Sequence, residues 1–287
     1  MTTLDNDPGR LRAVAETLAT EAAAFVRRRR AEVFGAHRAG AAAVRTKSTP
    51  TDPVTVVDTD TERLLRQRLG QLRPKDPVLG EEGGGPVDVP GADAEAVTWV
   101  LDPIDGTVNF VYGIPAYAVS VAARVGGVSV AGAVADVAGR RVYSAGAGLG
   151  AHVTDRRGTA RMRCTAVEDL SMALLGTGFG YSSQRRAAQA ELLARILPKV
   201  RDVRRIGSAA LDLCMVAAGR LDAFYEHGLN VWDYAAGALV AAEAGARLLL
   251  PDPERPAGTA GLTVAATPGI ADELVAMLQR FDAPIPE

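Results

Sequence analysis

A short apolar run that ends in two closely spaced aspartates constrains the fold of this chain more than any other feature. Residues 97–101, Val-Thr-Trp-Val-Leu, have the pattern of a buried strand, and Asp-Pro-Ile-Asp-Gly-Thr follows at 102–107. Pro103 fixes its own φ and removes a backbone donor, so we predict a stiff turn directly after the strand. Such a turn directs both carboxylates, and the Ile104 carbonyl between them, at one small volume.

The carboxylates of Asp102 and Asp105 repel each other at this spacing unless a cation lies between them. Ligands that are all oxygen favour a hard cation, Mg²⁺ before Zn²⁺. Gly106 and Thr107 then begin what we expect to be a helix through Asn109, and the free N–H groups of a helix start suit a phosphate. The residues alone leave one alternative open, an Asp-rich turn and helix cap without a ligand.

Three further acidic positions have ordinary explanations when each is taken by itself. Glu81 lies in Leu-Gly-Glu-Glu-Gly, a pattern typical of a solvated loop. Asp58 follows a short extended piece and fits a capped helix start. Asp233 fits an N-cap, with Trp232 before it as a hydrophobic staple. A site emerges only if the fold brings these positions to the aspartate pair.

Composition excludes several classes of protein. The chain has 287 residues, 48% of them hydrophobic, and a formal net charge of −2, which favours one soluble globular unit without autonomous nucleic-acid binding. The basic block at 27–30 follows a helical stripe, so we expect a solvated helix end there. Cys164 and Cys214 lack metal-site spacing, and we expect Cys214 to lie in the core. No secretory signal or membrane span is visible, so we expect a cytoplasmic protein.

The periodicity predicts an α+β fold without internal repeats. We expect helices over 10–33, 59–69, 185–197, 209–218, 233–244 and 270–281, and strands over 54–57, 97–101, 117–125, 128–137, 142–145, 150–154, 171–177 and 221–225. Gly126-Gly127 should make a hairpin turn, and Ser208 should cap the fourth helix. Residues 83–94 are expected to form a mobile surface loop.

In combination these motifs resemble the inositol monophosphatase family. They occur in the family's order: Val-Thr-x-x-Asp at 54–58, Gly-Glu-Glu at 80–82, Trp-x-x-Asp-Pro-Ile-Asp-Gly-Thr-x-Asn-Phe at 99–110, Gly-Ser-Ala-Ala at 207–210 and Trp-Asp at 232–233. The resemblance runs from about residue 10 to the end. It implies a layered α-β-α-β-α sandwich, with an N-terminal lobe of about 1–155 and a C-terminal lobe of about 156–287 that completes the active site. It also implies a homodimer.

The resemblance implies two to three Mg²⁺ ions. The first would be held by Glu81, Asp102 and the Ile104 carbonyl, and the second by Asp102, Asp105 and Asp233. A third, weaker ion would lie near Glu81, with Asp58 reaching it through water.

The resemblance also implies a reaction, the hydrolysis of a phosphomonoester by in-line attack of water without a covalent intermediate. Thr107, paired with Glu81, would orient and deprotonate the attacking water. The backbone at Gly106 and Thr107 would hold phosphate oxygens. The three histidines, at 37, 152 and 227, lie outside the metal motifs.

Contacts to the organic part of the substrate carry a weaker signal. Similarity points to four residues whose groups would meet substrate hydroxyls: Asp105, Ala209, Glu226 and Asp233. From the residues alone, Glu226 fits a surface strand end equally well. The turn of Gly207 and Ser208 is either a plain helix cap or a cap that also lines the pocket.

The resemblance implies inositol-1-phosphate as the preferred substrate and inhibition by Li⁺. Rivals in the family are fructose-1,6-bisphosphate, histidinol phosphate and 3′-phosphoadenosine nucleotides. A non-enzymatic role in binding RNA or the transcription machinery rests only on the arginines at 27–30. The chain departs from the family at Gly83-Gly84-Gly85-Pro86, where a Ser or acidic residue is usual, and the loop at Lys47 is expected to become ordered when metal binds.

Overall fold

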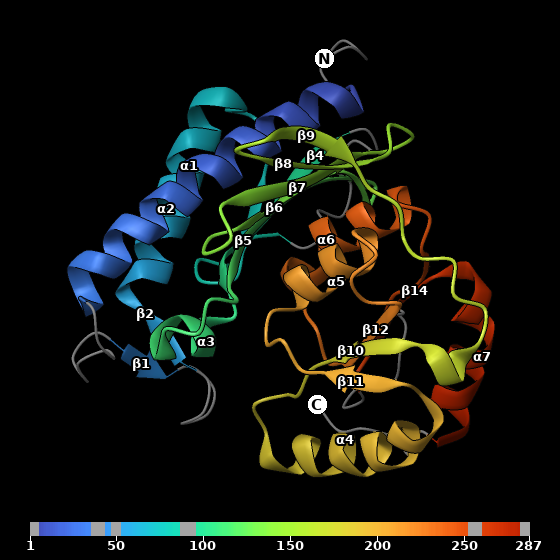
Figure 1. Cartoon of the computed structure of the whole chain (residues 1–287). Coiled ribbons are helices and arrows are strands. Elements are labelled where there is room, and N and C mark those ends of the chain that lie inside the picture. Colours follow the sequence, from blue (N-terminus) through green and yellow to red (C-terminus); the bar gives the residue numbers. More distant parts are fainter. Residues whose placement is uncertain (1–5, 36–43, 47–52, 87–95, 252–259, 282–287) are drawn as a thin grey trace.

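Two large β-sheets and three layers of helices alternate through the computed structural model of the chain, and a separate two-stranded sheet accompanies them (Figure 1). The structure describes residues 6–35, 44–46, 53–86, 96–251 and 260–281. Helices α1 (Pro8–Phe34) and α2 (Val56–Leu72) cover one side of the seven-stranded sheet, and α5 (Ala209–Ala217) and α6 (Val231–Glu243) lie between the two large sheets. Helices α4 (Ser183–Ile196) and α7 (Pro268–Phe281) cover the far side of the five-stranded sheet. This is the α-β-α-β-α order of the α+β fold that the sequence predicted.

The first sheet holds seven strands, in the order β3-β4-β5-β6-β7-β8-β9. Their bounds are β3 Val78–Gly80, β4 Val97–Asp105, β5 Ala118–Val125, β6 Val128–Asp136, β7 Arg141–Gly146, β8 Ala151–Asp155 and β9 Gly158–Arg161. β3 runs parallel to β4, and the other neighbouring pairs are antiparallel. Gly126 and Gly127 both have positive φ between β5 and β6, so the predicted glycine hairpin is confirmed.

Helices α1 (Pro8–Phe34) and α2 (Val56–Leu72) pack against the outer face of this sheet. In α1 the apolar residues Leu11, Ala15 and Leu18 recur at helical spacing, and each is at most 1% exposed. They share one core with side chains of β4, β5 and β6. The apolar stripe read from the sequence therefore fixes how α1 lies on the sheet.

The second sheet is mixed, with five strands in the order β11-β10-β12-β14-β13. Its strands are β10 Leu174–Thr177, β11 Asp202–Arg204, β12 Ala223–His227, β13 Arg247–Leu249 and β14 Leu262–Ala266. β10 pairs in parallel with β11 and β12, and β14 is antiparallel to both of its neighbours. The outer helices α4 (Ser183–Ile196) and α7 (Pro268–Phe281) share a core with this sheet.

The middle layer consists of α5 (Ala209–Ala217) and α6 (Val231–Glu243). The part of α6 that is buried between the sheets is made largely of alanine and glycine. A Cβ added to Gly132 of β6 would lie 3.0 Å from the Ala236 Cα, and one added to Gly237 would lie 2.9 Å from the Leu213 Cβ. The helix and its neighbours thus approach each other as closely as small residues allow.

The junction before α2 differs from the predicted boundary. Strand β2 (Pro53–Thr55) pairs with β1 (Val44–Thr46) and stops at Thr55, whereas we expected an extended piece over 54–57. The helix begins at Val56 because the Thr55 side chain caps it by accepting from backbone N–H groups. Asp58 is therefore in the first turn of α2 rather than before it.

Several other elements begin or end at residues that differ from the predicted ones. β4 continues through residue 105, so the two aspartates lie in the end of a strand rather than in a turn behind it. The segment expected as a strand over 171–177 begins with a 3₁₀ helix, Leu170–Met172, and the strand expected over 221–225 lies at 223–227. α6 begins at Val231 with Asn230 as its cap, so Asp233 is not the N-cap. Strands β1 (Val44–Thr46), β3, β9, β11, β13 and β14 were not predicted, because each has only three to five residues and little alternation.

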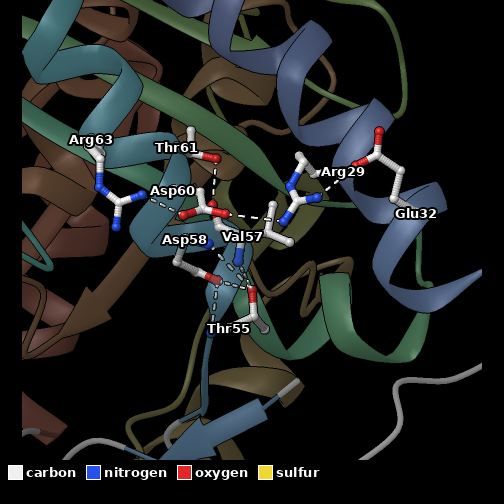
Figure 2. A network of polar contacts seen from close by, with 8 residues as sticks. All are labelled: Arg29, Glu32, Thr55, Val57, Asp58, Asp60, Thr61 and Arg63. Atoms are coloured by element: carbon white, nitrogen blue, oxygen red, sulfur yellow. Dashed lines mark hydrogen bonds and ion pairs between the residues drawn. The ribbon is translucent and has the colours of Figure 1, made fainter. Parts of the chain in front are cut away.

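The arginine block at 27–30 was predicted to be a solvated helix end, which holds for the exposed Arg28 but is wrong for the other three arginines. Arg27 donates to the Val137 carbonyl at 3.2 Å, and Arg30 donates to the Phe110 carbonyl at 3.2 Å. Figure 2 shows Arg29 between Glu32, at 2.7 Å, and Asp60 of α2, at 3.2 Å. These three arginines therefore join α1 to α2, to the short helix α3 (Thr107–Tyr112) and to the residue directly after β6.

Two of the predicted loops include residues that the structure does not describe. The loop at Lys47 and residues 87–94 of the expected mobile loop lie outside the described residues. Cys214 is fully buried in α5, as expected, and Ser208 caps that helix. Within the described ranges, no helix combines the length and the hydropathy that crossing a bilayer requires.

Candidate active site

Three carboxylates converge at the end of β4. Asp102, Asp105 and Asp233 each place an oxygen within 4.8 Å of the others. Asp102 pairs with Ser120 and Asp105 with Ala118, so β4 contains one more residue than β5 between these two points. The two β5 residues lie on one face of the sheet, and the bulge therefore turns both aspartates to that same face. Asp233 reaches them from the first turn of α6.

This cluster is electrostatically costly without a cation. Burial, and then the charges of Glu81, Asp105 and Asp233, raise the pKa of Asp102 well above its usual range. Burial and the same kind of repulsion also raise the pKa of Asp233. All the donor atoms are oxygens, and their repulsion would be relieved by a hard cation between them. The donor set therefore fits Mg²⁺.

Asp105 differs from the other two aspartates because its hydrogen-bond donors come from the start of α5, whereas Asp102 and Asp233 accept from nearby backbone N–H groups of Ile104 and Asn230. Asp105 accepts from the Ser208 hydroxyl at 2.5 Å and from the Ala210 N–H at 2.7 Å, both at the start of α5. Burial raises the pKa of Asp105 to about 6, while these hydrogen bonds act in the opposite direction. The acidic end of β4 is thus attached to the Gly-Ser-Ala-Ala segment.

Glu81 lies directly after β3, the parallel neighbour of β4. Its backbone N–H donates to the Leu101 carbonyl at 3.2 Å, beside Asp102. Its charge contributes to the raised pKa of Asp102, Asp105 and Asp233. The Gly-Glu-Glu motif is therefore brought to the aspartates by strand pairing between β3 and β4, a pairing that the sequence did not reveal.

Thr107 connects this cluster to α2. Its hydroxyl lies 3.2 Å from Asp58 Oδ1 and 3.0 Å from the Ile104 carbonyl. Asp58 is fully buried and also contacts Thr55, as Figure 2 shows. Burial raises the pKa of Asp58 to about 7. The structure thus gives the Thr107 hydroxyl different partners from the Glu81 that the resemblance implied.

A left-handed glycine joins β4 to the short helix α3 (Thr107–Tyr112). Gly106 has φ 94°, and an added Cβ would lie 2.9 Å from the Gly207 carbonyl and 3.0 Å from that of Ala116. Only glycine satisfies both the dihedral angle and the close approach. The contact sets the Asp-Gly-Thr segment against the turn that precedes α5.

One open cavity of about 730 Å³ contains nearly all of the predicted site. The predicted residues that line it come from both sheets and from the middle helices: Glu81, Asp102, Ile104, Asp105, Gly106, Thr107, Gly207, Ser208, Ala209, Glu226 and Asp233. Asp58 is not part of the lining and reaches the site through Thr107. The Cys214 thiol is buried in the core.

The cavity also contains residues that sequence reasoning missed. It is lined by the loop 178–182, Arg185, Arg205, His227 and Gly228. Burial raises the pKa of Glu226 to about 8 there, against the opposing charges of Arg205 and Arg185. A Cβ on Gly178 would lie 1.8 Å from a Glu226 carboxylate oxygen, so the glycine makes room for it. The Gly-Phe-Gly pattern after β10 was the available signal.

The model of the inositol monophosphatase family matches residues 7–282. The chain belongs to the inositol monophosphatase family. The inositol-1-monophosphatase of Mycobacterium bovis is 74% identical over 292 residues, with 100% of both chains covered. That of Mycobacterium leprae is 73% identical, covering 100% of this chain and 99% of the relative. A more distant relative from Pseudomonas aeruginosa, named Nus factor SuhB, is 39% identical over 68% of this chain and 70% of its own.

Solved structures agree with this membership. Mycobacterium tuberculosis SuhB superposes with a TM-score of 0.81 at 67% sequence identity, covering 96% of this chain and 98% of that one. The inositol monophosphatase from Anabaena gives a TM-score of 0.76 at 28% identity, covering 96% and 98%. This member of the inositol monophosphatase family is accordingly a phosphatase, a phosphoric monoester hydrolase acting on small molecules.

Proposed function

We propose that the chain hydrolyses inositol-1-phosphate to myo-inositol and phosphate in a Mg²⁺-dependent reaction. The observation that carries the proposal is the convergence of Asp102, Asp105 and Asp233 within 4.8 Å. The three carboxylates would repel a dianionic phosphate ester. An enzyme that binds such an ester beside them therefore needs cations that offset the negative charge of the cluster and of the ester. The Mycobacterium relatives named inositol-1-monophosphatase support inositol-1-phosphate over the rival substrates.

The residues that would hold two to three Mg²⁺ ions are those that supply oxygen at one end of the cavity: Glu81, Asp102, the Ile104 carbonyl, Asp105 and Asp233, with Asp58 further away. When bound, the ions would neutralise phosphate charge and lower the pKa of a nearby water. The protein's part is to keep these ligands fixed, which the β4 bulge and the α5 contacts of Asp105 accomplish.

Thr107 is the residue that we propose to orient the attacking water. Its hydroxyl has one proton, which it donates to Asp58 or to the Ile104 carbonyl, so its oxygen keeps a lone pair that can accept from water. A proton taken from the water would pass through this hydroxyl to the buried Asp58 carboxylate. The role that the resemblance gives to Thr107 with Glu81 is thus proposed here with Asp58 as the direct partner.

Substrate contacts divide between the two ends of the cavity. At the acidic end the backbone of Gly106 and Thr107 is proposed to hold phosphate oxygens. The organic part would lie toward the start of α5 and the end of β12, where the candidate contacts are Gly207, Ser208, Ala209 and Glu226, and it would also meet Asp105 and Asp233 of the acidic cluster. Since these residues come from separate elements, the polyol would be recognised only in the complete fold.

A phosphate-release panel tests the proposal. Inositol-1-phosphate, fructose-1,6-bisphosphate, histidinol phosphate and a 3′-phosphoadenosine nucleotide are compared with Mg²⁺ and with chelator, and Li⁺ is added to the best substrate. We expect Mg²⁺-dependent release to be fastest from inositol-1-phosphate and to be inhibited by Li⁺. Faster turnover of another ester by a large factor would overturn the substrate, and full activity in chelator would overturn the metal.

A second candidate role, in a transcription complex, has support only from relatives named Nus factor SuhB, such as that of Pasteurella multocida, 37% identical over 79% of this chain. The arginines that suggested it, Arg27, Arg29 and Arg30, make contacts within the molecule. Complementation of a deletion strain by an inactive Asp105→Asn variant would favour that role. We also propose, from the family resemblance, a cytoplasmic homodimer, which sedimentation velocity and cell fractionation test.

A further inference from the structure

The turn that carries Glu81 is held by an ion pair that lies outside the cavity lining. After β3 the chain turns back on itself, and Gly80 and Gly84 exchange backbone hydrogen bonds of 3.0 Å in both directions. Between them, the N–H groups of Glu82 and Gly83 point to the carboxylate of Glu62 on α2, at 2.7 and 2.8 Å. One buried carboxylate, 2% exposed, thus satisfies two consecutive amides of the turn.

Arg66, one helical turn further along α2, provides the other contacts that hold this turn. Its Nε donates to Glu62 at 2.8 Å. Its terminal nitrogens donate to the carbonyls of Val78, at 3.3 Å, and Gly84, at 2.5 Å. The ion pair therefore accepts from the amides within the turn and donates to carbonyls on both sides of it. It fixes the backbone on either side of Glu81 without contacting the cavity.

Gly80 and Gly83 leave the space that the Glu62 carboxylate occupies. A Cβ on Gly80 would lie 2.4 Å from the Glu62 carboxyl carbon, and one on Gly83 would lie 2.6 Å from Glu62 Oε1. Any larger residue would push the carboxylate off the turn. The Gly-Glu-Glu-Gly segment thus needs its glycines for contact with Glu62, an explanation separate from loop flexibility.

The same helix serves the other side of the site. Glu62 lies four residues after Asp58, so both carboxylates are on one face of α2. Asp58 accepts from Thr107, while Glu62 holds the turn of Glu81. One rigid element therefore sets the position of the proposed water-orienting hydroxyl relative to that of the proposed metal ligand.

We propose that the Glu62–Arg66 pair is a positioning device that aims Glu81 at the metal site and thereby sets the affinity for Mg²⁺. The inference rests on the proposed function in that Glu81 is taken as a ligand. Neither residue lines the cavity in which substrate and metal are proposed to bind. Without the pair, the glycine-rich turn would have to be ordered at the moment of metal binding, and that cost lowers affinity.

The central variant is Glu62→Gln. In either orientation, its amide nitrogen meets one of the two turn N–H groups, so one hydrogen bond becomes a repulsive contact. We expect the Mg²⁺ concentration for half-maximal activity, and the calorimetric Kd for Mg²⁺, to rise about tenfold or more, as for other residues behind a metal ligand. At saturating Mg²⁺ the KM for inositol-1-phosphate should stay within about twofold. Hydrogen exchange at the amides of residues 82 and 83 should accelerate.

Two companion variants separate positioning from general destabilisation. Gly83→Ala leaves the charges in place but brings a methyl group against Glu62, and it should weaken Mg²⁺ binding in the same way. Glu21→Gln on α1 removes a different ion pair of α2, the one between Glu21 and Arg68 at 2.7 Å, and should leave Mg²⁺ binding unchanged. If Glu62→Gln is not recovered folded by circular dichroism, Gly83→Ala decides the question.

Wild-type Mg²⁺ affinity in the folded Glu62→Gln or Gly83→Ala protein would overturn the proposal, as would an equal loss in Glu21→Gln. Calorimetry and hydrogen exchange do not require turnover. The positioning role is therefore decided even if wild-type protein fails to hydrolyse inositol-1-phosphate, a failure that would overturn the proposed function alone.

Discussion

At the scale of single residues, Asp105 joins the separate parts of the candidate site. It lies within reach of Asp102 and Asp233 and also receives hydrogen bonds from Ser208 and Ala210. A carboxylate can accept from these donors and still offer its other oxygen to a cation. No neutral side chain of similar size does both.

Asp105→Asn should therefore abolish activity while leaving the fold intact. The amide cannot balance a divalent charge, and its NH₂ group competes with the donors of α5. We expect Mg²⁺-dependent phosphate release to fall by roughly 100-fold or more, a typical loss for a charged group of this kind. The exposed Asp155→Asn, in the β8–β9 hairpin, is the matched control and should retain wild-type turnover. Retained Mg²⁺-dependent activity in Asp105→Asn would contradict the assignment.

Thr107 makes a separate prediction about the proton path. Thr107→Val keeps the shape but removes the hydroxyl that contacts Asp58. We expect kcat to fall about 100-fold or more with KM changed little, as for the loss of a proton-transfer group. Thr107→Ser keeps the hydroxyl and should retain most of the activity. A steady-state comparison in which Val and Ser behave alike would rule out a role for the hydroxyl.

At the scale of elements, the junction of β4 with α3 shapes the acidic end of the cavity. Gly106→Ala would place a methyl group 2.9 Å from the Gly207 carbonyl at a φ of 94°. We expect a loss of about 1–3 kcal/mol in the free energy of unfolding, measured by urea denaturation, together with reduced activity. Gly148→Ala is a matched control, since Gly148 has φ 76° but nothing within 4 Å of an added Cβ. Equal losses in both would show that the dihedral angle alone matters.

The elements also show which parts of the fold could be predicted from sequence. The long helices and the β5–β6 hairpin carry periodicity or a glycine pair, so local patterns sufficed for them. The residues of the site that are adjacent in sequence, such as Asp102 and Asp105, were also identified.

The remaining features depend on packing between distant segments. Strand β3 has three residues, and only its pairing with β4 explains why Glu81 meets Asp102. Arg185 and Arg205 reach the cavity because α4 and β11 flank β10, and nothing local distinguishes them from surface arginines. Glu62 looked like any helical glutamate, since its role depends on a turn about 20 residues further along the chain.

At the scale of the whole molecule, the buried carboxyl groups predict a pH dependence of stability in metal-free protein. In the fold the pKa values are raised to about 7 for Asp58, about 6 for Asp105 and about 8 for Glu226. Unfolded, these groups titrate near pH ~4. The folded protein therefore binds more protons between these limits, and stability should be fully present below pH ~4 for these groups and lost as pH rises toward 8.

Thermal unfolding checks this sign. In chelator, the midpoint should fall between pH 5.5 and 8. With saturating Mg²⁺ the fall should be smaller or reversed, since the cation replaces the protons and binds only the folded protein. A midpoint that rises with pH in chelator would contradict the pKa shifts, and an unchanged slope with Mg²⁺ would contradict metal binding by these groups.

The alanine- and glycine-rich helix α6 has a consequence for how this family can change. An added Cβ would lie 3.0 Å from the Ala236 Cα at Gly132 and 2.9 Å from the Leu213 Cβ at Gly237, so the helix packs too closely against its neighbours to admit a larger residue at either glycine. Asp233 lies in the first turn of this helix, so its position depends on how the helix packs in the interlayer core. The position of this proposed metal ligand thus depends on residues that do not line the cavity. A methyl group gained or lost in the middle layer would shift Asp233 relative to the other proposed metal ligands while every one of them stayed the same, so we expect changes at buried alanines to alter activity.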